Sequence, residues 1–353
     1  MGDKRHLHPP ALAGGLGKVL IISSGETSAS AHDMFEHVFA GLKPPVRMAI
    51  METPAGFELN SALVARKVGD FVKVTMKNYS PSVSIVPARR RDGPFSTNAF
   101  DRVSPIVDAD CIYLGAGSPT YAVGHLRETL AWSCLLGRHQ QGAALCLASA
   151  AAIAFGSKAL PVYEIYKAGH DLHWIDGLDF FGRFGLDLAI VTHWNNQEGG
   201  AQLDTSRCFM GRSRMERLIK MLPPTTVILG IDEYTGLVLD FENEVCHLAG
   251  KGGLALHSGG AIETFGPGST FPIQRLGPYH RPVEAPVCGS GVEVAGRDAE
   301  EVQPTPELRE FLERRERARE SRRWTEADQI RQQVSKLGFE IQDTAEGPRL
   351  HRR

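Results

Sequence analysis

The sequence has no long apolar run and no strong excess of charge of one sign. In 353 residues with a net charge of −2, no stretch is apolar for long enough to span a bilayer, so we expect no transmembrane helix. The near-neutral balance argues against a general binder of nucleic acids or membrane surfaces. Residues 1–17 carry charge but no apolar core, so we interpret them as a flexible lead and not as a secretory signal.

The sequence also has no CxxC pair, although it contains six cysteines. The cysteines are scattered and mostly have apolar neighbours. This pattern indicates buried, reduced thiols in a cytoplasmic protein and argues against disulfides or a zinc site. We therefore expect neither a metal nor a cofactor. The six are Cys111, Cys134, Cys146, Cys208, Cys246 and Cys288.

Short apolar runs alternate with helical patterns over the first 260 residues or so. This alternation is typical of a parallel sheet with helices on both faces. We predict a three-layer α/β/α fold with a mostly parallel, flavodoxin-like sheet, followed by a C-terminal helical hairpin. The expected strands are Lys18–Ser23, Arg47–Met51, Ser82–Val86, Cys111–Leu114, Gly142–Leu147, Leu188–Thr192 and Thr226–Ile231, then a β-hairpin at Gly236–Phe241 and Val245–Leu248.

The composition divides the chain into four parts. The flexible lead (1–17) precedes the α/β domain (18–264). In residues 265–304, proline and glycine cluster and the periodicity is lost, which predicts a linker. Residues 305–353 form the tail, with a charged helix over Pro306–Trp324 and a second helix that starts near Thr325 and stops at Gly338.

The stretch Ala143–Gly156 holds the main candidate for a catalytic residue. An apolar run ends at Ala148, Ser149 follows, and an alanine-rich helical start begins at Ala150. Strand, sharp turn and helix with a hydroxyl at the turn is the layout of a nucleophile elbow, which aims the first helical N–H groups at the group under attack. A buried strand followed by an alanine-rich core helix gives the same pattern.

A serine nucleophile needs a base, an orienting acid and an oxyanion hole. His193 and Glu233 each follow a predicted strand, and in one parallel sheet both would share an edge with Ser149. The alternatives are a loop-facing histidine and a solvated carboxylate. The N–H groups expected to form the oxyanion hole belong to Ala150 and to one of Gly115, Ala116 and Gly117.

Three segments, in this order, resemble the peptidase S51 family. This family comprises the cyanophycinase and aspartyl-dipeptidase relatives, and its fold is that of class I glutamine amidotransferases. Leu147–Gly156 (LASAAAIAFG) resembles G-x-S-A-G-A with an apolar helix. Gly177–Trp194, followed by Arg212–Leu218, resembles an apolar strand, a histidine and R-x-R-x-x-R-L. Gly230–Gly236 (GIDEYTG) resembles G-I-D-E-x-T-A. The resemblance covers residues 18–260 and implies a hydrolase that cleaves an amide bond in a small peptide-like substrate.

The same resemblance assigns roles to individual residues. It makes Ser149 the nucleophile, His193 the base and Glu233 the third member of the triad. Gly115–Ser118 corresponds to the loop that contributes to the oxyanion hole, and it brings Ser118 to the substrate. The arginines of the second segment would hold an acidic group of the substrate in a fork, or else form salt bridges on a helix surface. They are Arg212, Arg214 and Arg217.

Several positions depart from the family pattern. Leu147 and Ala151 stand where the family has glycines beside the serine, and Val191-Thr192 replaces an Asp-Gln pair, which argues against cyanophycin as the substrate. A fold relative that has lost catalysis and binds a ligand or partner is therefore the alternative function. Cys146 is a second candidate nucleophile, but it lies inside an apolar run and is interpreted as a buried thiol.

The tail, Arg315–Arg353, resembles the C-terminal end of cysteinyl-tRNA synthetases. It contains R-x-x-A-R, W-x-x-A-D-x-I-R, L-x-x-x-G and D-T-x-x-G in that order. RNA contact is one interpretation of its basic residues. The interleaved glutamates weaken the positive field, so docking or homodimer formation is the favoured one, and we expect no membrane partner. The arginines in question are Arg314, Arg315, Arg317, Arg319, Arg322 and Arg323.

Overall fold

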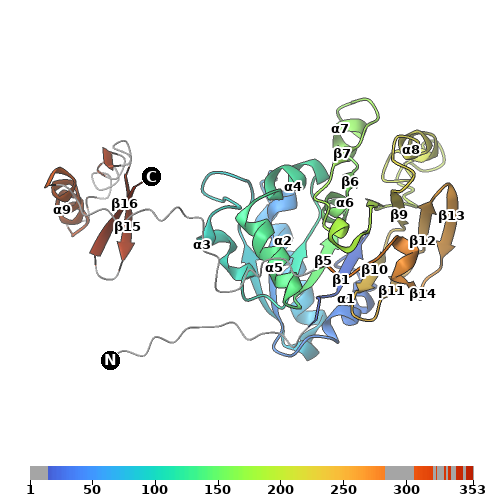
Figure 1. Ribbon diagram of the computed structural model, residues 1–353, viewed down its shortest axis with the longest axis horizontal. Coiled ribbons are helices and arrows are strands. Elements are labelled where there is room, and N and C mark those ends of the chain that lie inside the picture. Colours follow the sequence, from blue (N-terminus) through green and yellow to red (C-terminus); the bar gives the residue numbers. More distant parts are fainter. Residues whose placement is uncertain are drawn as a thin grey trace. The chain divides into compact units, whose positions relative to one another are not determined.

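The computed structural model describes residues 15–282, 306–320, 323, 330, 333–334, 339–344 and 347–352 (Figure 1). The chain divides into two compact units, Met1–Cys288 and Gly289–Arg353, and each is considered by itself. Within the described residues, no helix is both long and apolar enough to cross a membrane.

The first unit is built on an eight-stranded sheet with the order β14-β11-β10-β1-β5-β4-β2-β3 (Figure 1). The run from β1 to β3 is parallel, and β10, β11 and β14 continue it as antiparallel strands. The mostly parallel sheet predicted from the sequence is confirmed. The strands are β1 (Val19–Ile22), β2 (Arg47–Met51), β3 (Ser82–Val86), β4 (Cys111–Leu114), β5 (Ala144–Ala148), β10 (Thr235–Asp240), β11 (Val245–Gly250) and β14 (Thr270–Pro272).

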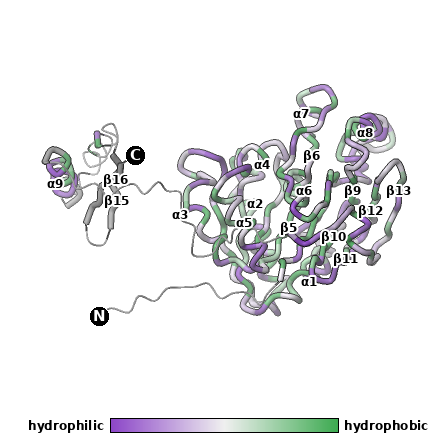
Figure 2. The backbone as a smooth tube through the Cα atoms, viewed as in Figure 1, coloured by the Kyte–Doolittle hydropathy of each residue, from purple (hydrophilic) through white to green (hydrophobic). Residues whose placement is uncertain are grey.

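Helices cover both faces of this sheet because successive strand residues point to opposite faces. Leu20 and Cys146 pack with helices on one face, and Ile21 and Leu147 pack with helices on the other. Hydrophobic residues along the strands are green in Figure 2. The first face carries α1 (Ala31–Phe39) and α2 (Ser61–Thr75), and the second carries α4 (Pro119–Leu126), α5 (Leu130–Gln140) and α6 (Ala150–Phe155).

A second sheet has the order β13-β12-β9-β8-β6-β7, in which β6, β8 and β9 are parallel. The expectation that one sheet presents Ser149, His193 and Glu233 is wrong, because β5 belongs to the first sheet while β8 and β9 belong to the second. Ser23, directly after β1, links the two sheets: its hydroxyl donates to the carbonyl of Ile231 (2.9 Å) and accepts the N–H of His193 (2.7 Å). The second sheet comprises β6 (Lys158–Ala159), β7 (Ile175–Asp176), β8 (Leu188–Val191), β9 (Val227–Ile231), β12 (Leu254–Ser258) and β13 (Ala261–Phe265).

Part of the expected linker belongs to the folded α/β unit. Strand β14 and a 3-10 helix over Ile273–Leu276 lie inside residues 265–304. Phe271, Ile273 and Leu276 are buried in the main core, so the unit extends past residue 264 to at least Pro282. Three apolar side chains anchor this segment without any periodic pattern, which is why composition alone indicated a linker. Residues 283–304 of the expected linker lie outside the described residues.

The tail contains a helix and a β-hairpin. Helix α9 (Pro306–Glu320) packs Leu308 and Leu312 against Val334. Three residues of the expected second helix, Ile330, Gln333 and Val334, are helical, and its other residues lie outside the described ones. The sequence analysis missed the antiparallel strands β15 (Phe339–Thr344) and β16 (Gly347–Arg352), so the helical hairpin is not a full account of the tail.

Candidate active site

Ser149 occupies the sharp turn between β5 and α6. Its backbone has φ 50° and ψ −111°, a combination that costs a residue with a side chain about 1–3 kcal/mol. The N–H of Ser149 donates to the carbonyl of Ile22 (2.9 Å), and its carbonyl accepts the N–H of Ile153 (3.1 Å). The turn is therefore held from both sides in the strained form that an elbow requires.

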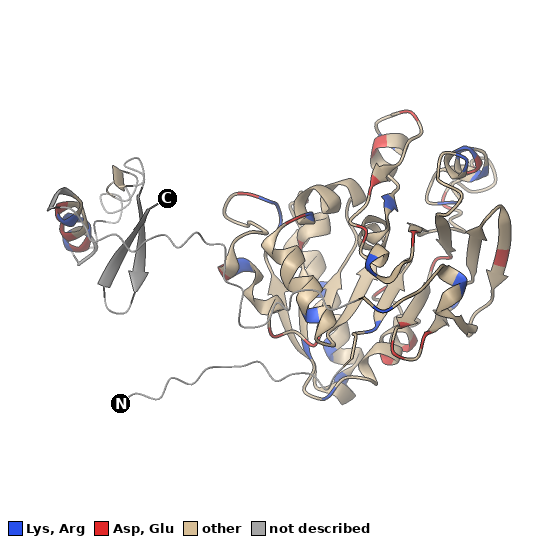
Figure 3. Ribbon diagram, in the orientation of Figure 1, with Lys and Arg blue, Asp and Glu red and all other residues tan. Residues whose placement is uncertain are grey.

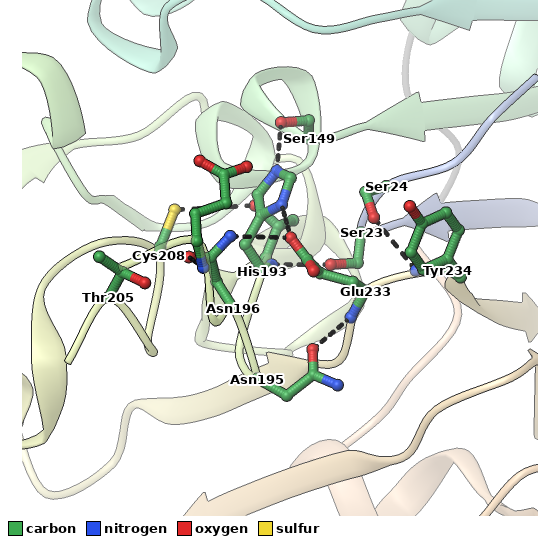
Figure 4. A network of polar contacts seen from close by, with 12 residues as sticks. Ser23, Ser24, Ser149, His193, Asn195, Asn196, Thr205, Cys208, Glu233 and Tyr234 are labelled. Atoms are coloured by element: carbon green, nitrogen blue, oxygen red, sulfur yellow. Dashed lines mark hydrogen bonds and ion pairs between the residues drawn. The ribbon is translucent and has the colours of Figure 1, made fainter. Parts of the chain in front are cut away.

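Ser149, His193 and Glu233 form a chain of contacts between the two sheets (Figure 4). Ser149 Oγ lies 3.1 Å from His193 Nε2, and His193 Nδ1 lies 3.0 Å from Glu233 Oε1. His193 follows β8 and has a positive φ of 51°, while Glu233 follows β9. The exposed fractions of the two side chains are 21% and 25%, so both are partly screened from water.

Two asparagines complete the surroundings of Glu233. Asn196 Nδ2 donates to Glu233 Oε1 at 3.0 Å, and the backbone N–H of Glu233 donates to Asn195 Oδ1 at 2.8 Å. The hydrogen bond from His193, and then the one from Asn196, lowers the pKa of Glu233, although partial burial opposes the shift. Glu233 is thus an ionised acceptor that fixes the orientation of the His193 ring.

Four residues of this network had no assigned role in the sequence-based site. They are Ser23, Ser24, Asn195 and Asn196. Ser24 Oγ accepts the N–H of Tyr234 at 3.1 Å and so holds the chain after Glu233 against the end of β1 (Figure 4). The signal that identifies Ser23 and Ser24 is a hydroxyl side chain directly after a strand, whereas Asn195 and Asn196 lie in the polar loop that follows His193.

Two of the expected oxyanion residues, Gly117 and Ala150, line the same pocket as Ser149 and His193. Gly117 has φ 146°, and a Cβ there would lie 1.8 Å from the carbonyl oxygen of Pro54, so only glycine fits. Gly115 and Ala116 line a separate, smaller cavity. The structure therefore brings Gly117 and Ala150, but neither Gly115 nor Ala116, to the pocket beside Ser149.

The expected substrate-binding residues are not among those that line this pocket. Ser118 Oγ accepts the N–H of Tyr121 at 3.2 Å and caps helix α4. On α8 (Gly211–Ile219), Arg212 and Arg217 are exposed, and Figure 2 shows hydrophilic and hydrophobic residues mixed along this helix. The guanidinium of Arg214 donates to backbone carbonyls of its own segment. None of the three arginines lines the pocket beside Ser149.

The two residues that replace the family's glycines beside the serine are packed in the hydrophobic core. Leu147 and Ala151 are fully buried, and Leu147 pairs in register with Ile21 and Leu114. Cys146 lies on the opposite face of β5 with its sulfur 3.6 Å from that of Cys111. The contact with Cys111, together with burial, raises the pKa of the Cys146 thiol well above its usual range, so Cys146 is an inert core residue.

The α/β unit is similar to solved peptidase structures. A peptidase from an acI-B1 actinobacterium superposes with a TM-score of 0.57 at 19% identity, covering 73% of this chain and 97% of that chain. A putative peptidase E protein from Listeria monocytogenes EGD-e gives a TM-score of 0.43 at 13% identity, covering 71% of this chain and 99% of that chain. The first comparison confirms the fold expected from the motifs, and at this identity the likeness concerns the fold alone.

The tail is similar to part of a different protein. The family model described as the cysteinyl-tRNA ligase anticodon binding domain matches residues 305–348. A cysteine–tRNA ligase from Rubrobacter xylanophilus is 42% identical over 72 residues, which is 18% of this chain and 15% of that relative. The resemblance expected for the tail is confirmed, and the chain spans only about 15% of the ligase's length.

Proposed function

We propose that this chain is a serine hydrolase that cleaves an amide bond in a small peptide-like substrate. The observation that carries the proposal is the unbroken series of contacts from Ser149 Oγ through His193 to Glu233, with Ser149 held in a strained turn. The structural neighbour from the acI-B1 actinobacterium is described as a peptidase, and its similar fold adds support.

The geometry suits acyl transfer. As Ser149 Oγ attacks the carbonyl carbon, His193 Nε2 takes its proton and then delivers it to the leaving amine, while ionised Glu233 stabilises the imidazolium. We assign stabilisation of the oxyanion to the N–H groups of Gly117 and Ala150, the two members of the expected set that line the pocket. A water molecule, activated by the same histidine, then hydrolyses the acyl-enzyme and restores Ser149.

The alternative, a relative that has lost catalysis, receives no support from the two positions that suggested it. Leu147 and Ala151 lie in the core, and the turn at Ser149 keeps its positive φ. Backbone strain of this kind persists where function requires it. An ionised, hydrogen-bonded acid behind the histidine is likewise an arrangement that catalysis uses.

The direct test compares wild type with Ser149→Ala on a set of dipeptides. We expect the variant to lose turnover while its circular dichroism and unfolding midpoint stay at or above those of wild type. Ser213→Ala, an exposed serine on α8, is the matched control and keeps full activity. Equal hydrolysis by wild type and Ser149→Ala would refute the proposal.

For the tail we propose docking or dimer formation in preference to RNA contact. Helix α9 carries exposed residues of both signs of charge (Figure 3), which weakens the attraction for phosphates. Light scattering of the full chain is expected to give a dimer, and a salt-dependent gel shift with tRNA would contradict this assignment. Among the described side chains of α9, the exposed charged residues are Arg309, Glu310, Glu313, Arg314 and Arg317.

A further inference from the structure

We infer that the pocket beside Ser149 selects one apolar or aromatic side chain on the residue that supplies the scissile carbonyl. This inference rests on the proposed function and names its substrate class. It replaces the acidic group expected from the arginines of α8, none of which lines the pocket. The chemistry of the pocket lining, its size and the way in which one wall is held lead to the same substrate class.

Part of the pocket lining is apolar and buried. Ile153, Val162 and Cys208 line it with exposed fractions of only 2%, 6% and 3%. Two aromatic rings, those of Tyr166 and Phe209, lie beside each other with their centroids 5.2 Å apart. Such a surface gains free energy by covering an apolar side chain, and aromatic rings add favourable edge and face contacts with another ring.

The formal charges of the lining lie on exposed residues. Among the described residues that line the pocket, those with a formal charge are Lys167 and Glu198, one of each sign and both exposed. Lys167 Nζ lies 5.0 Å from the centre of the Tyr166 ring. A substrate carboxylate placed among the buried lining residues would lose its water without gaining a buried cation, which is strongly unfavourable.

The volume of the pocket restricts the occupant. It is about 210 Å³, below the roughly 300 Å³ at which pockets for drug-sized ligands begin. One side chain fits, whereas several residues of a longer peptide do not. Ser149 and His193 line this same space, so the side chain that fills it belongs to the residue whose carbonyl Ser149 attacks.

Phe209 is held in place by a strained backbone segment. Arg207, Cys208 and Phe209 have φ of 60°, 57° and 67°, a left-handed backbone conformation that is unfavourable for residues with a side chain. The N–H of Cys208 donates to the carbonyl of His193 (3.1 Å), and the N–H of Arg207 donates to that of Trp194 (2.9 Å). The wall of the pocket is thereby tied to the strand end that carries the catalytic histidine.

Arg214 fixes the other end of this segment. Its Nη2 donates to the carbonyl of Phe209 at 2.9 Å and its Nε to that of Met210 at 2.6 Å. The Phe209 ring centroid lies 6.3 Å from that of His193. Arg214 is therefore a positioning residue that acts through Phe209, and this accounts for one of the arginines that the sequence assigned to an acidic substrate group.

Binding to Ser149→Ala tests the pocket without turnover. In calorimetry, Phe-Gly should bind this variant about tenfold or more tightly than Asp-Gly, a difference of about 1.4 kcal/mol. Adding Phe209→Ala should reduce the preference to about threefold or less. Phe57→Ala removes an exposed ring that does not line the pocket and should leave the preference unchanged. Equal or tighter binding of Asp-Gly overturns the inference.

Two further variants guard against misfolding of Phe209→Ala. Tyr163 lines the pocket with 46% of its surface exposed, so Tyr163→Ala should reduce the preference for Phe-Gly without disturbing the core. In the active enzyme, Arg214→Gln should raise KM for Phe-Gly by a factor about five times as large as the factor for Ala-Gly. The reason is that only the larger side chain contacts the wall that Arg214 positions. An equal rise for both substrates contradicts the positioning role.

Failure of this inference differs from failure of the proposed function. Hydrolysis that depends on Ser149 but favours Asp-Gly refutes the pocket assignment and leaves the hydrolase. A clear preference for Phe-Gly in binding, with no Ser149-dependent hydrolysis of any dipeptide, refutes the hydrolase and leaves the pocket.

Discussion

Asn196 Nδ2 and Glu233 Oε1 lie 3.0 Å apart, and the same carboxylate oxygen accepts a hydrogen bond from His193 Nδ1. The exposed fraction of Asn196 is 1%, so its amide is shielded from water and has a fixed partner. Asn196 thus orients Glu233, which in turn orients the ring of His193. Its hydrogen bond also contributes to the lowered pKa of Glu233.

Replacing Asn196 by alanine should lower kcat about tenfold to a hundredfold, because a small displacement of the catalytic groups is costly. The lost hydrogen bond had favoured the ionised carboxylate, so its removal raises the pKa of Glu233. The loss of kcat/KM that accompanies protonation of Glu233 should therefore begin at a higher pH. Gln197→Ala, an exposed change in the same loop, is the control. A profile for Asn196→Ala identical to that of wild type would contradict this role.

Replacing Ser23 by alanine should destabilise the junction of the two sheets. The Ser23 side chain is fully buried, and the change leaves the N–H of His193 and the carbonyl of Ile231 without this partner. The expected loss is about 1–3 kcal/mol in the free energy of unfolding measured with urea. Ser24→Ala, whose hydroxyl is less buried, should cost less. Equal stability of Ser23→Ala and wild type would show that the junction does not depend on Ser23.

Shortening Leu147 tests whether the family glycine at this position is needed. Leu147 is fully buried between strands β1 and β4, so Leu147→Ala should cost about 2–5 kcal/mol of stability through the cavity it creates. Leu63→Ala, at a side chain that is 51% exposed, is the matched control and should cost little. Turnover per folded molecule should not rise in Leu147→Ala. A rise would mean that the leucine restrains the elbow.

His139 should make the protein sensitive to mild acid. Its ring is fully buried, with Nε2 2.7 Å from the carbonyl of Gly17 and no hydrogen-bond partner for Nδ1 among the described residues. Burial lowers the pKa of His139 to about 3. In the unfolded chain this histidine has a pKa of about 6.5. Between about pH 6.5 and 3 the unfolded state therefore binds a proton that the folded state does not bind, so the stability of the fold decreases as the pH falls through this range.

The expected loss attributable to His139 is about 2 kcal/mol between pH 7 and pH 5. His139→Gln, which cannot titrate, should remove that part of the pH dependence from urea unfolding curves. His32→Gln, at an exposed position on α1, should leave the dependence intact. If His139→Gln and wild type lose the same stability between these pH values, His139 is not the source.

The sequence predicted the limits of three strands that are short runs rich in apolar residues. Residues Arg47–Met51, Ser82–Val86 and Cys111–Leu114 were expected as strands, and β2, β3 and β4 have these bounds. The two-sheet arrangement was not predicted, because the periodicity of a strand does not say which sheet it joins, and the hydroxyl of Ser23 that links the sheets has no periodic signature. The anchor at Phe271–Leu276 was missed for a similar reason, since it depends on packing partners distant in sequence. The β-hairpin in the tail pairs two neighbouring segments, which the sequence analysis left unassigned after the expected helix stop at Gly338.

The site was predicted in part. Ser149, His193 and Glu233 were named from strand ends and motif order, and His193 lies within hydrogen-bonding distance of both Ser149 and Glu233. Asn196 received no role because an amide in a polar loop has no distinctive pattern. The pocket wall could not be predicted from the sequence either. Phe209 lines the pocket at the end of three consecutive residues with positive φ, and their residue types do not indicate this conformation.

The most direct test of the account is labelling of the intact protein with a fluorophosphonate probe, followed by mass spectrometry of its peptides. We predict a single adduct on Ser149, lost in Ser149→Ala and reduced about a hundredfold or more in rate in His193→Ala, because the hydroxyl then has no base. Ser149→Ala that labels as strongly as wild type, or an adduct on a different serine, would contradict the assignment of Ser149 as the nucleophile.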